Sequence, residues 1–270
     1  MSLTLLKRIL TSTVLIGATA AILFFAEPVY FAIEVAVFIA LALYEFFTLL
    51  KGVNIPVYRF FGIGMGIILP IVVYLEFGVT GSGDVLFLIF GCLFLFVLQF
   101  FRRENSQALV GIALTLFGIL YVSWFLSHLI KIRFMEGGII WVAYLILVTK
   151  AQDIGAYLVG SAIGRHPLIP HISPKKSVEG AIGGLLFSIG ASVAMRSYIP
   201  IAFGWLHLVL IGAFIGVLGQ IGDLSESLMK RFCNAKDSGS VLPGMGGFLD
   251  AVDSVLFTAP IFYFHLQIYR

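Results

Sequence analysis

Nine long apolar runs occupy most of this sequence of 270 residues. A helix needs about 20 mostly apolar residues to cross a bilayer, and each run approaches or exceeds that length. The runs are continuous and do not alternate apolar with polar residues as the strands of a membrane barrel do, so we expect helices. They are residues 9–26, 28–50, 56–75, 84–101, 107–130, 137–163, 177–198, 201–222 and 247–268.

Composition excludes the soluble classes of protein. Apolar residues make up 60% of the chain and charged residues only 11%, whereas soluble globular chains have about 45–50% and about 25%. A chain of this size has too little interior to hide so much apolar surface from water. Two cysteines cannot define a disulfide framework. The sequence therefore predicts an all-α, polytopic integral membrane protein with about nine transmembrane helices.

The basic residues predict the orientation, because Lys and Arg favour cytoplasmic loops. With the N-terminus in the cytoplasm, twelve of the 17 Lys and Arg residues fall in inside segments. We therefore expect a cytoplasmic N-terminus, an outside C-terminus and a location in the inner (plasma) membrane of the cell. The inside residues are Lys7, Arg8, Lys51, Arg59, Arg102, Arg103, Arg165, Lys175, Lys176, Lys230, Arg231 and Lys236.

The number of polar residues within the apolar runs increases toward the C-terminal half of the chain. Residues 1–140 are apolar runs with short connections, which predicts a scaffold with a lipid-facing surface. Residues 141–270 hold the unusual polar residues, and we expect the catalytic part there. Charged residues inside spans are functional candidates by default. Glu34 and Glu45 have no polar constellation around them in the sequence, so we interpret them as structural or snorkelling residues.

Two polar blocks lie in and after the sixth run. Lys150, Asp153 and Tyr157 are spaced to share one face of a helix, and a neutralising Lys150–Asp153 pair is the plain interpretation. The loop at residues 165–180 combines basic groups and hydroxyls with a helix start, which would suit a phosphate. The alternative is ordinary positive charge in a cytoplasmic loop, with Ser177 as a helix cap.

The third block is the densest. Four polar residues at spacing i, i+3, i+4 and i+7 stack two carboxylates, a hydroxyl and an ammonium on one helical face. A glycine-rich turn at residues 243–247 would let the backbone approach a ligand closely, and it leads into the ninth run. The four residues are Asp223, Glu226, Ser227 and Lys230.

Asp250 and Asp253 begin the ninth run, three residues apart, so both carboxylates project to the same side. Two carboxylates this close in a low dielectric need a cation or a shared proton. Without a His or Cys cluster they favour Mg²⁺ over Zn²⁺, with a shared proton or a sodium site as competing interpretations. Carboxylates, Mg²⁺, lysines and a glycine-rich turn fit reactions on phosphates, ahead of an ion-coupled transporter.

These blocks resemble the signature of the phosphatidate cytidylyltransferases, also called CDP-diacylglycerol synthases. The signature runs Ser-x-x-Lys-Arg-x4-Lys-Asp, then Leu/Ile-Pro-Gly-His-Gly-Gly, then Asp-Arg-x-Asp-Ser. This sequence departs from it at Met245, where the family has His, and at Ala251, where it has Arg. The carboxylates and lysines remain, which favours an active though divergent member. The matching segments are 153–157, 173–180, 222–226, 227–237, 242–247 and 250–254.

The resemblance implies that CTP and phosphatidate react to give CDP-diacylglycerol and pyrophosphate, for phospholipid biosynthesis. The orientation expected from the basic residues places this reaction at the cytoplasmic face of the bilayer. It implies Mg²⁺ as the cofactor, with room for a second cation, and no nucleic-acid partner. The phosphate monoester is already ionised, so the reaction needs no strong general base. The implied Mg²⁺ ligands are Asp223, Asp250 and Asp253, with Asp153 as a helper.

The resemblance also implies the substrate contacts. Lys230, which we count with the three aspartates as catalytic, would bind the CTP phosphates together with Arg231 and Lys236. Lys176, Ser173 and Ser177 would hold one phosphate group, and the backbone of the 243–247 turn would approach the nucleotide. The implied substrate-binding set is Ser173, Lys176, Ser177, Glu226, Ser227, Arg231, Lys236, Asp237, Gly244, Gly246 and Gly247.

Other functions stay open at this point. Another CTP-using membrane enzyme, such as a polyprenol kinase, would use the same polar groups on a different lipid. A transporter would use the intramembrane carboxylates as an ion path, but transporters predict repeats in both halves of the chain, and here the polar residues crowd one half. The third alternative is an inactive relative of this family. The glycine-containing stretch at residues 180–184 is a candidate homodimer interface.

Overall fold

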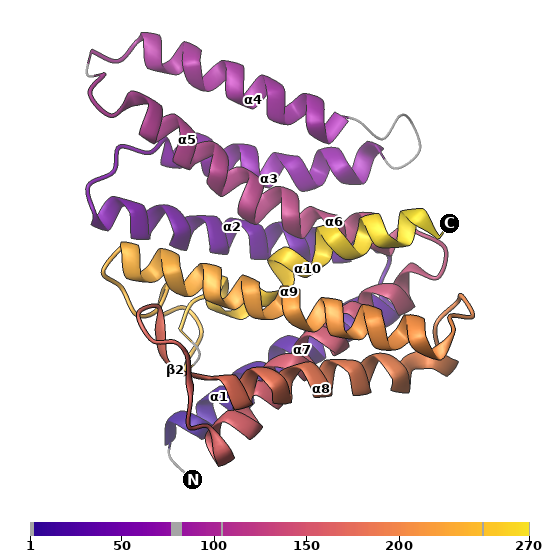
Figure 1. The fold of residues 1–270 in the computed structure, drawn as a ribbon. Helices are drawn as coiled ribbons and strands as arrows, with labels where there is room; N and C mark the ends of the chain where they lie inside the picture. Colours follow the sequence, from indigo (N-terminus) through magenta and orange to yellow (C-terminus); the bar gives the residue numbers. More distant parts are fainter. Residues whose placement is uncertain (1–2, 77–82, 104, 245, 270) are drawn as a thin grey trace. The chain divides into compact units, whose positions relative to one another are not determined.

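The computed structural model describes residues 3–76, 83–103, 105–244 and 246–269, and it is almost entirely helical (Figure 1). Within these residues, seven helices are long and apolar enough to span a membrane, and two shorter apolar helices cover Leu10–Phe25 and Arg59–Leu75. Every one of the nine predicted runs falls on a helix. The predicted all-α, polytopic membrane class is confirmed.

The element bounds show where the sequence-based boundaries were inexact. The run at 201–222 is part of a helix that continues to Phe232, so the densest polar block is helical throughout. The run at 107–130 holds a π-helical turn, Ile119–Trp124, between two α-helical segments. In chain order the elements are α1 (Leu3–Phe25), α2 (Pro28–Gly52), α3 (Arg59–Glu76), α4 (Gly83–Phe100), α5 (Ala108–Gly118), η1 (Ile119–Trp124), α6 (Phe125–Arg133), α7 (Gly138–Ile163), β1 (Pro167–Ile169), β2 (Ser173–Ser177), α8 (Val178–Ala194), η2 (Met195–Ser197), α9 (Trp205–Phe232) and α10 (Phe248–Ile268).

The chain packs as two compact units. The first contains residues 1–134 and 232–251, and the second contains residues 135–231 and 252–270. The boundary at 134/135 is a packing boundary, so the predicted functional division at 140/141 stays a prediction. The segment 232–251, which carries the glycine-rich turn, packs with the N-terminal helices of the first unit.

The first unit is built around α2. Its buried face carries large side chains such as Ile39, Leu43 and Phe47, and α2 packs against α3, η1 and α6. Gly62 and Gly66 of α3 face Phe47 and Leu43, where a Cβ atom would collide with those side chains. Glycine on α3 therefore lets the two helices approach closely. In Figure 1, α4 lies beside α3 and α5, and its many exposed apolar side chains suit contact with lipid.

The second unit is organised by the pair α7 and α8, which run side by side (Figure 1). The glycines of α8 face α7: a Cβ at Gly183 would lie 2.5 Å from the Cβ of Val159, and one at Gly180 would lie 2.8 Å from the carbonyl oxygen of Ala156. The stretch at 180–184, which the sequence suggested for a homodimer, is used here for packing within the chain.

Substitution of Gly183 by alanine should therefore destabilise the second unit. The added methyl group overpacks the α7–α8 contact, and overpacking costs about 1–3 kcal/mol. The thermal unfolding midpoint in detergent measures the effect. Gly190→Ala is the matched control, because a Cβ at Gly190 meets nothing within 4 Å on the same helix. Equal midpoints for the two variants would contradict the packing account.

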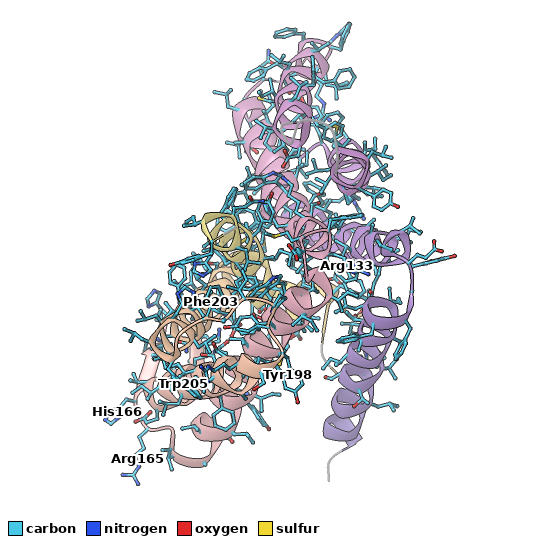
Figure 2. All side chains as sticks on the ribbon, turned by 90° about the vertical axis from the view of Figure 1, so that its right-hand side faces the viewer. Arg133, Arg165, His166, Tyr198, Phe203 and Trp205 are labelled. Atoms are coloured by element: carbon cyan, nitrogen blue, oxygen red, sulfur yellow. The ribbon has the colours of Figure 1, made fainter. Side chains whose placement is uncertain are left out.

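The loop between α7 and α8 is a small antiparallel hairpin, a feature that the sequence did not predict. Pro167 pairs with Ser177 and Ile169 with Ser173. Glu179, in the first turn of α8, closes the base of the hairpin by accepting hydrogen bonds from the backbone N–H groups of Arg165 and His166. Figure 2 shows Arg165 and His166 projecting from this end of the second unit.

Candidate functional site

The polar residues of α7 contact the C-terminal signature in the second unit. The Lys150 ammonium donates to Oδ2 of Asp153 at 2.9 Å and to Oγ of Ser254 at 3.1 Å. The Ser254 hydroxyl then donates to the same Asp153 oxygen at 3.1 Å. The Lys150–Asp153 pair expected from their spacing is confirmed. Ser254 is fully buried, so this triangle fixes both charged side chains against α10.

A second contact joins the hairpin to α9. The Lys176 ammonium of β2 lies 2.6 Å from Oδ2 of Asp223, and the Arg231 Nε–H donates to the carbonyl oxygen of Ile172 at 3.1 Å. The hairpin thus lies along the polar end of α9. Two blocks that are about 50 residues apart in the sequence meet through a lysine and an aspartate that we had assigned separately to phosphate and to Mg²⁺.

The remaining polar face of α9 is largely buried. Glu226 is fully buried and Ser227 is 8% exposed, and Glu226 forms an ion pair with Lys230 one turn later. Asp253 of α10 is 7% exposed, and its Oδ1 accepts a hydrogen bond from the backbone N–H of Ser254 at 2.5 Å. Gly222 lies against the backbone of Asp253, where a Cβ would collide with its carbonyl oxygen. Glycine at 222 therefore lets α9 approach the signature aspartate.

In the first unit the glycine-rich turn folds over a carboxylate. Leu242 and Gly246 exchange backbone hydrogen bonds of 2.9 and 3.1 Å, and Gly244 and Gly246 have positive φ values of 81° and 102°, which glycine adopts without strain. Oδ2 of Asp250 accepts hydrogen bonds from the Ser238 N–H at 2.9 Å, the Ser238 hydroxyl at 2.8 Å and the Gly247 N–H at 2.8 Å. Asp250 therefore shapes this turn.

Glu45 of α2 lies beneath the same turn. It is 3% exposed, and its Oε2 accepts the backbone N–H of Leu249 at 2.9 Å and the Ser238 hydroxyl at 3.1 Å. A Cβ at Gly247 would collide with Glu45 and Ser238. Helix N-termini expose N–H groups that lack partners within the helix, and at α10 the carboxylates of Glu45 and Asp250 satisfy two of the N–H groups at its start. These contacts agree with the structural alternative for Glu45, although the sequence did not identify its partners.

The other predicted site residues occupy several settings. Ser177 is the N-cap of α8, and its Oγ accepts the Gly180 N–H at 3.1 Å, so the cap alternative is confirmed for this side chain. Ser173 pairs with Ile169 in the hairpin. Lys236 and Asp237 lie in the connection that precedes the turn, where the Asp237 Cβ faces Gly246. Met245, the position where the family has His, lies outside the described residues.

The carboxylates of the site are the kind of donor that Mg²⁺ takes. Among the residues that the structure describes, no three His, Cys, Asp or Glu side chains gather closely enough to hold a metal ion. Mg²⁺ does not require such a cluster, because it commonly takes one or two carboxylates and completes its shell with water and substrate phosphates. The carboxylates of Asp153 and Asp223 are each neutralised by a lysine at 2.9 and 2.6 Å. These donors fit a cation that arrives with a phosphate able to take over the lysines.

Three polar residues in or beside these contacts were absent from the predicted site. Ser254 had no assigned role within the signature, and Glu45 was interpreted as structural or snorkelling because no polar residues surround it in the sequence. Gln152 is 3% exposed, its Oε1 has no hydrogen-bond partner among the described residues, and it faces Gly219 of α9. A polar residue in an apolar run was the available signal for all three.

Comparison with known proteins assigns a family and several relatives. Residues 6–269 match the sequence pattern of the cytidylyltransferase family. The chain is 38% identical over 151 residues to a phosphatidate cytidylyltransferase of Bacillus subtilis (strain 168), which is 56% of each protein. It is 36% identical over 158 residues to one of Staphylococcus haemolyticus (strain JCSC1435), which is 58% of this chain and 60% of that one. It is also 35% identical over 167 residues to an uncharacterised Escherichia coli (strain K12) protein, YnbB, which is 62% of this chain and 55% of that one. The chain spans about 55–60% of the length of these relatives.

Proposed function

The chain belongs to the cytidylyltransferase family, and from this premise we propose that it is a phosphatidate cytidylyltransferase. It would transfer the cytidylyl group of CTP to phosphatidate in a Mg²⁺-dependent reaction and release pyrophosphate. The observation that carries the proposal is the assembly of the signature residues in the second unit. Lys176 contacts Asp223 at 2.6 Å, and Lys150 contacts both Asp153 and Ser254.

The resting ion pairs suggest how the site receives its substrates. A phosphate is a stronger partner for an ammonium than one carboxylate oxygen, because it carries more charge and more acceptor atoms. When a phosphate binds, Lys176 would move from Asp223 to that phosphate. Lys230 and Arg231 on the last turns of α9, with Lys236 beyond it, would bind the other CTP phosphates. Ser173 and the backbone of the 243–247 turn would add neutral hydrogen bonds.

The aspartates would hold the cation. We propose Asp223, Asp250 and Asp253 as Mg²⁺ ligands with Asp153 as a helper, on the strength of the signature and of the three-residue spacing on α10. The contacts of Asp250 with Ser238 and Gly247 fix where its carboxylate lies. Bound Mg²⁺ would neutralise charge that develops on the phosphate oxygens.

The proposed reaction forms one P–O bond and breaks another. An oxygen of the phosphatidate phosphate attacks the α-phosphorus of CTP in line, and the bond from that phosphorus to the oxygen bridging to the β-phosphorus breaks. Pyrophosphate leaves with that electron pair, and the basic side chains neutralise its charge. The attacking phosphate monoester is already ionised, so Met245 and Ala251 at two family positions are compatible with turnover. The charge distribution of the sequence favours the cytoplasmic side of the inner membrane, where CTP is available.

Pyrophosphate release by the purified protein in detergent tests this proposal. We expect release only when CTP, phosphatidate and Mg²⁺ are all present, with a CDP-linked lipid as the co-product. Omitting the lipid, replacing CTP by ATP and adding a chelator are the controls. Release that proceeds without phosphatidate, or folded protein that binds CTP and releases nothing, would contradict it.

A further inference from the structure

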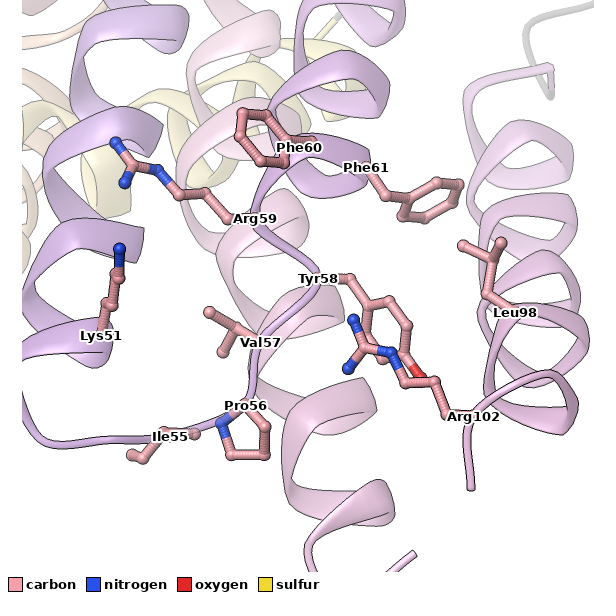
Figure 3. A pocket seen from close by; sticks show the side chains of 10 residues that line it. All are labelled: Lys51, Ile55, Pro56, Val57, Tyr58, Arg59, Phe60, Phe61, Leu98 and Arg102. Carbon is pink, nitrogen blue, oxygen red and sulfur yellow. The ribbon is translucent and has the colours of Figure 1, made fainter. Parts of the chain in front are cut away.

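A separate cavity of about 570 Å³ lies in the first unit, where α2 ends and α3 begins (Figure 3). It is lined by the segment that joins these helices and by the end of α4. None of its lining residues belongs to the signature segments. They are Lys51, Ile55, Pro56, Val57, Tyr58, Arg59, Phe60, Phe61, Leu98 and Arg102.

Three cations line this cavity without an acidic residue among the ten. In Figure 3, Lys51 and Arg59 reach toward the same side of the cavity, while Arg102 lies across Tyr58. Within the described part of the chain, none of the three forms an ion pair. The Nε of Arg59 is buried and has no hydrogen-bond partner in that part. Three cations that line one cavity without a carboxylate among its ten residues favour an anionic ligand.

The guanidinium groups of Arg59 and Arg102 are held in place by stacking on tyrosine rings. Arg102 lies over the ring of Tyr58, 3.9 Å from the ring centre, and Arg59 lies over Tyr44 at 4.4 Å. Tyr58 is itself held, because its N–H donates to Oγ1 of Thr115 at 3.0 Å and its hydroxyl to Gln99. A guanidinium stacked on a fixed ring loses little freedom when it binds a phosphate. The N-terminal end of α3, at Arg59, adds a favourable field for an anion.

The rest of the lining is apolar and opens outward. Phe60 is 90% exposed, and Phe61 stacks on Phe94 of α4 with ring centres 5.5 Å apart. Leu98 lies on the same helix. A free phosphate would contact only the cationic part of the lining. A phospholipid would contact the cationic part with its phosphate and the apolar part with its acyl chains. Basic residues that served orientation alone would need neither a cavity nor stacked rings.

We propose that this cavity binds an anionic phospholipid. Its headgroup lies between Lys51 and Arg59 on one side of the cavity and Arg102 on the other, and its acyl chains lie along Phe60, Phe61 and Leu98. Basic pockets at membrane helices are a recurrent way to bind such headgroups. The site is distinct from the signature residues, and it does not depend on the reaction proposed above.

Native mass spectrometry of the full chain, reconstituted with defined lipids, tests the proposal. We expect wild-type protein to retain phosphatidylglycerol at least tenfold better than phosphatidylcholine. Arg59→Gln combined with Arg102→Gln should abolish that preference. The control is Arg196→Gln, which removes one charge, as each of the two substitutions does, from a guanidinium that also lies over a ring, that of Trp205 at 4.3 Å. It should retain the preference.

Two further measurements test whether the bound phosphate belongs to a lipid or is free phosphate, and whether the apolar lining contributes to binding. Phe60→Ser should weaken retention of phosphatidylglycerol, and because Phe60 is exposed the variant should fold normally. Inorganic phosphate at millimolar concentration should leave the lipid bound. Equal retention of the two lipids by wild type, an unchanged preference in the double variant, or displacement by inorganic phosphate would each overturn the assignment to a lipid.

Discussion

Asp223→Asn should reduce cytidylyl transfer by roughly a hundredfold to a thousandfold, the range seen when one group that stabilises developing charge is removed. The amide keeps the size of the side chain and loses its negative charge. It can then neither balance Lys176 in the resting protein nor hold a cation beside the nucleotide. The initial rate with saturating CTP and phosphatidate measures the effect.

The loss should be one of rate and not of folding. The side chains of Lys176 and Asp223 are 26% and 37% exposed, and ion pairs at partly exposed positions contribute up to about 1 kcal/mol. The thermal midpoint of Asp223→Asn should therefore stay near that of wild type. Glu27→Gln, an equal change at an exposed carboxylate that makes no capping hydrogen bond, should keep full activity. An Asp223→Asn variant within threefold of the wild-type rate would contradict the proposed role.

Glu45→Ala should loosen the glycine-rich turn and the start of α10, although Glu45 is about 200 residues away from both in the sequence. The substitution leaves the Leu249 N–H without its acceptor, takes one partner from the Ser238 hydroxyl and opens a cavity. An unsatisfied buried group costs about 1–3 kcal/mol, and the cavity adds to this, so we expect a loss of about 3 kcal/mol. Hydrogen exchange of residues 238–249 in detergent should rise.

Glu34 of the same helix provides the matched control for this prediction. Its Oε1 accepts one hydrogen bond, from Thr19 at 2.7 Å, so Glu34→Ala should leave exchange at 238–249 unchanged. Glu45→Gln should restore much of the protection, because an amide oxygen can still accept the Leu249 N–H. Equal exchange at 238–249 in wild type and Glu45→Ala would show that the carboxylate does not hold the turn.

The fold class was predictable because it depends on local properties. Each apolar run identifies its own helix, and the excess of apolar residues excludes a soluble fold. The spacing of Lys150 and Asp153 similarly predicted their pair, since three residues on a helix bring side chains together. The helical spacing of the polar residues from Asp223 to Lys230 likewise predicted that the helix continues beyond the apolar run, and α9 does extend to Phe232.

The missed features depend on contacts between distant residues. The β1–β2 hairpin has no alternating apolar pattern. It is held at its base by Glu179, which accepts the Arg165 N–H, and at its turn by Arg231 of α9, which donates to the Ile172 carbonyl oxygen. Glu45 had no polar neighbours in the sequence, yet its partners in space are Ser238 and Leu249. Sequence spacing identifies neighbours within a helix, but it gives no information about pairs that are distant in the sequence.

Family membership argues against one of the alternative functions, the ion-coupled transporter, and leaves the lipid kinase open. The transporter interpretation rested on the intramembrane carboxylates, and Asp153 and Lys150 are engaged with each other and with Ser254. A cytidylyltransferase pattern over residues 6–269 is not expected of a transporter. A CTP-using lipid kinase remains chemically close, because it would bind the same nucleotide. The two enzymes differ in which phosphorus of CTP reaches the lipid.

The fate of that phosphorus is the most direct test of the central claim. The purified protein would be given phosphatidate, Mg²⁺ and CTP labelled either at the α- or at the γ-phosphorus. A cytidylyltransferase places the α-label in the lipid phase and leaves the γ-label in water-soluble pyrophosphate, and this is the predicted result. A γ-label in the lipid would identify a kinase, and no transfer of either label by folded, CTP-binding protein would contradict the proposed function.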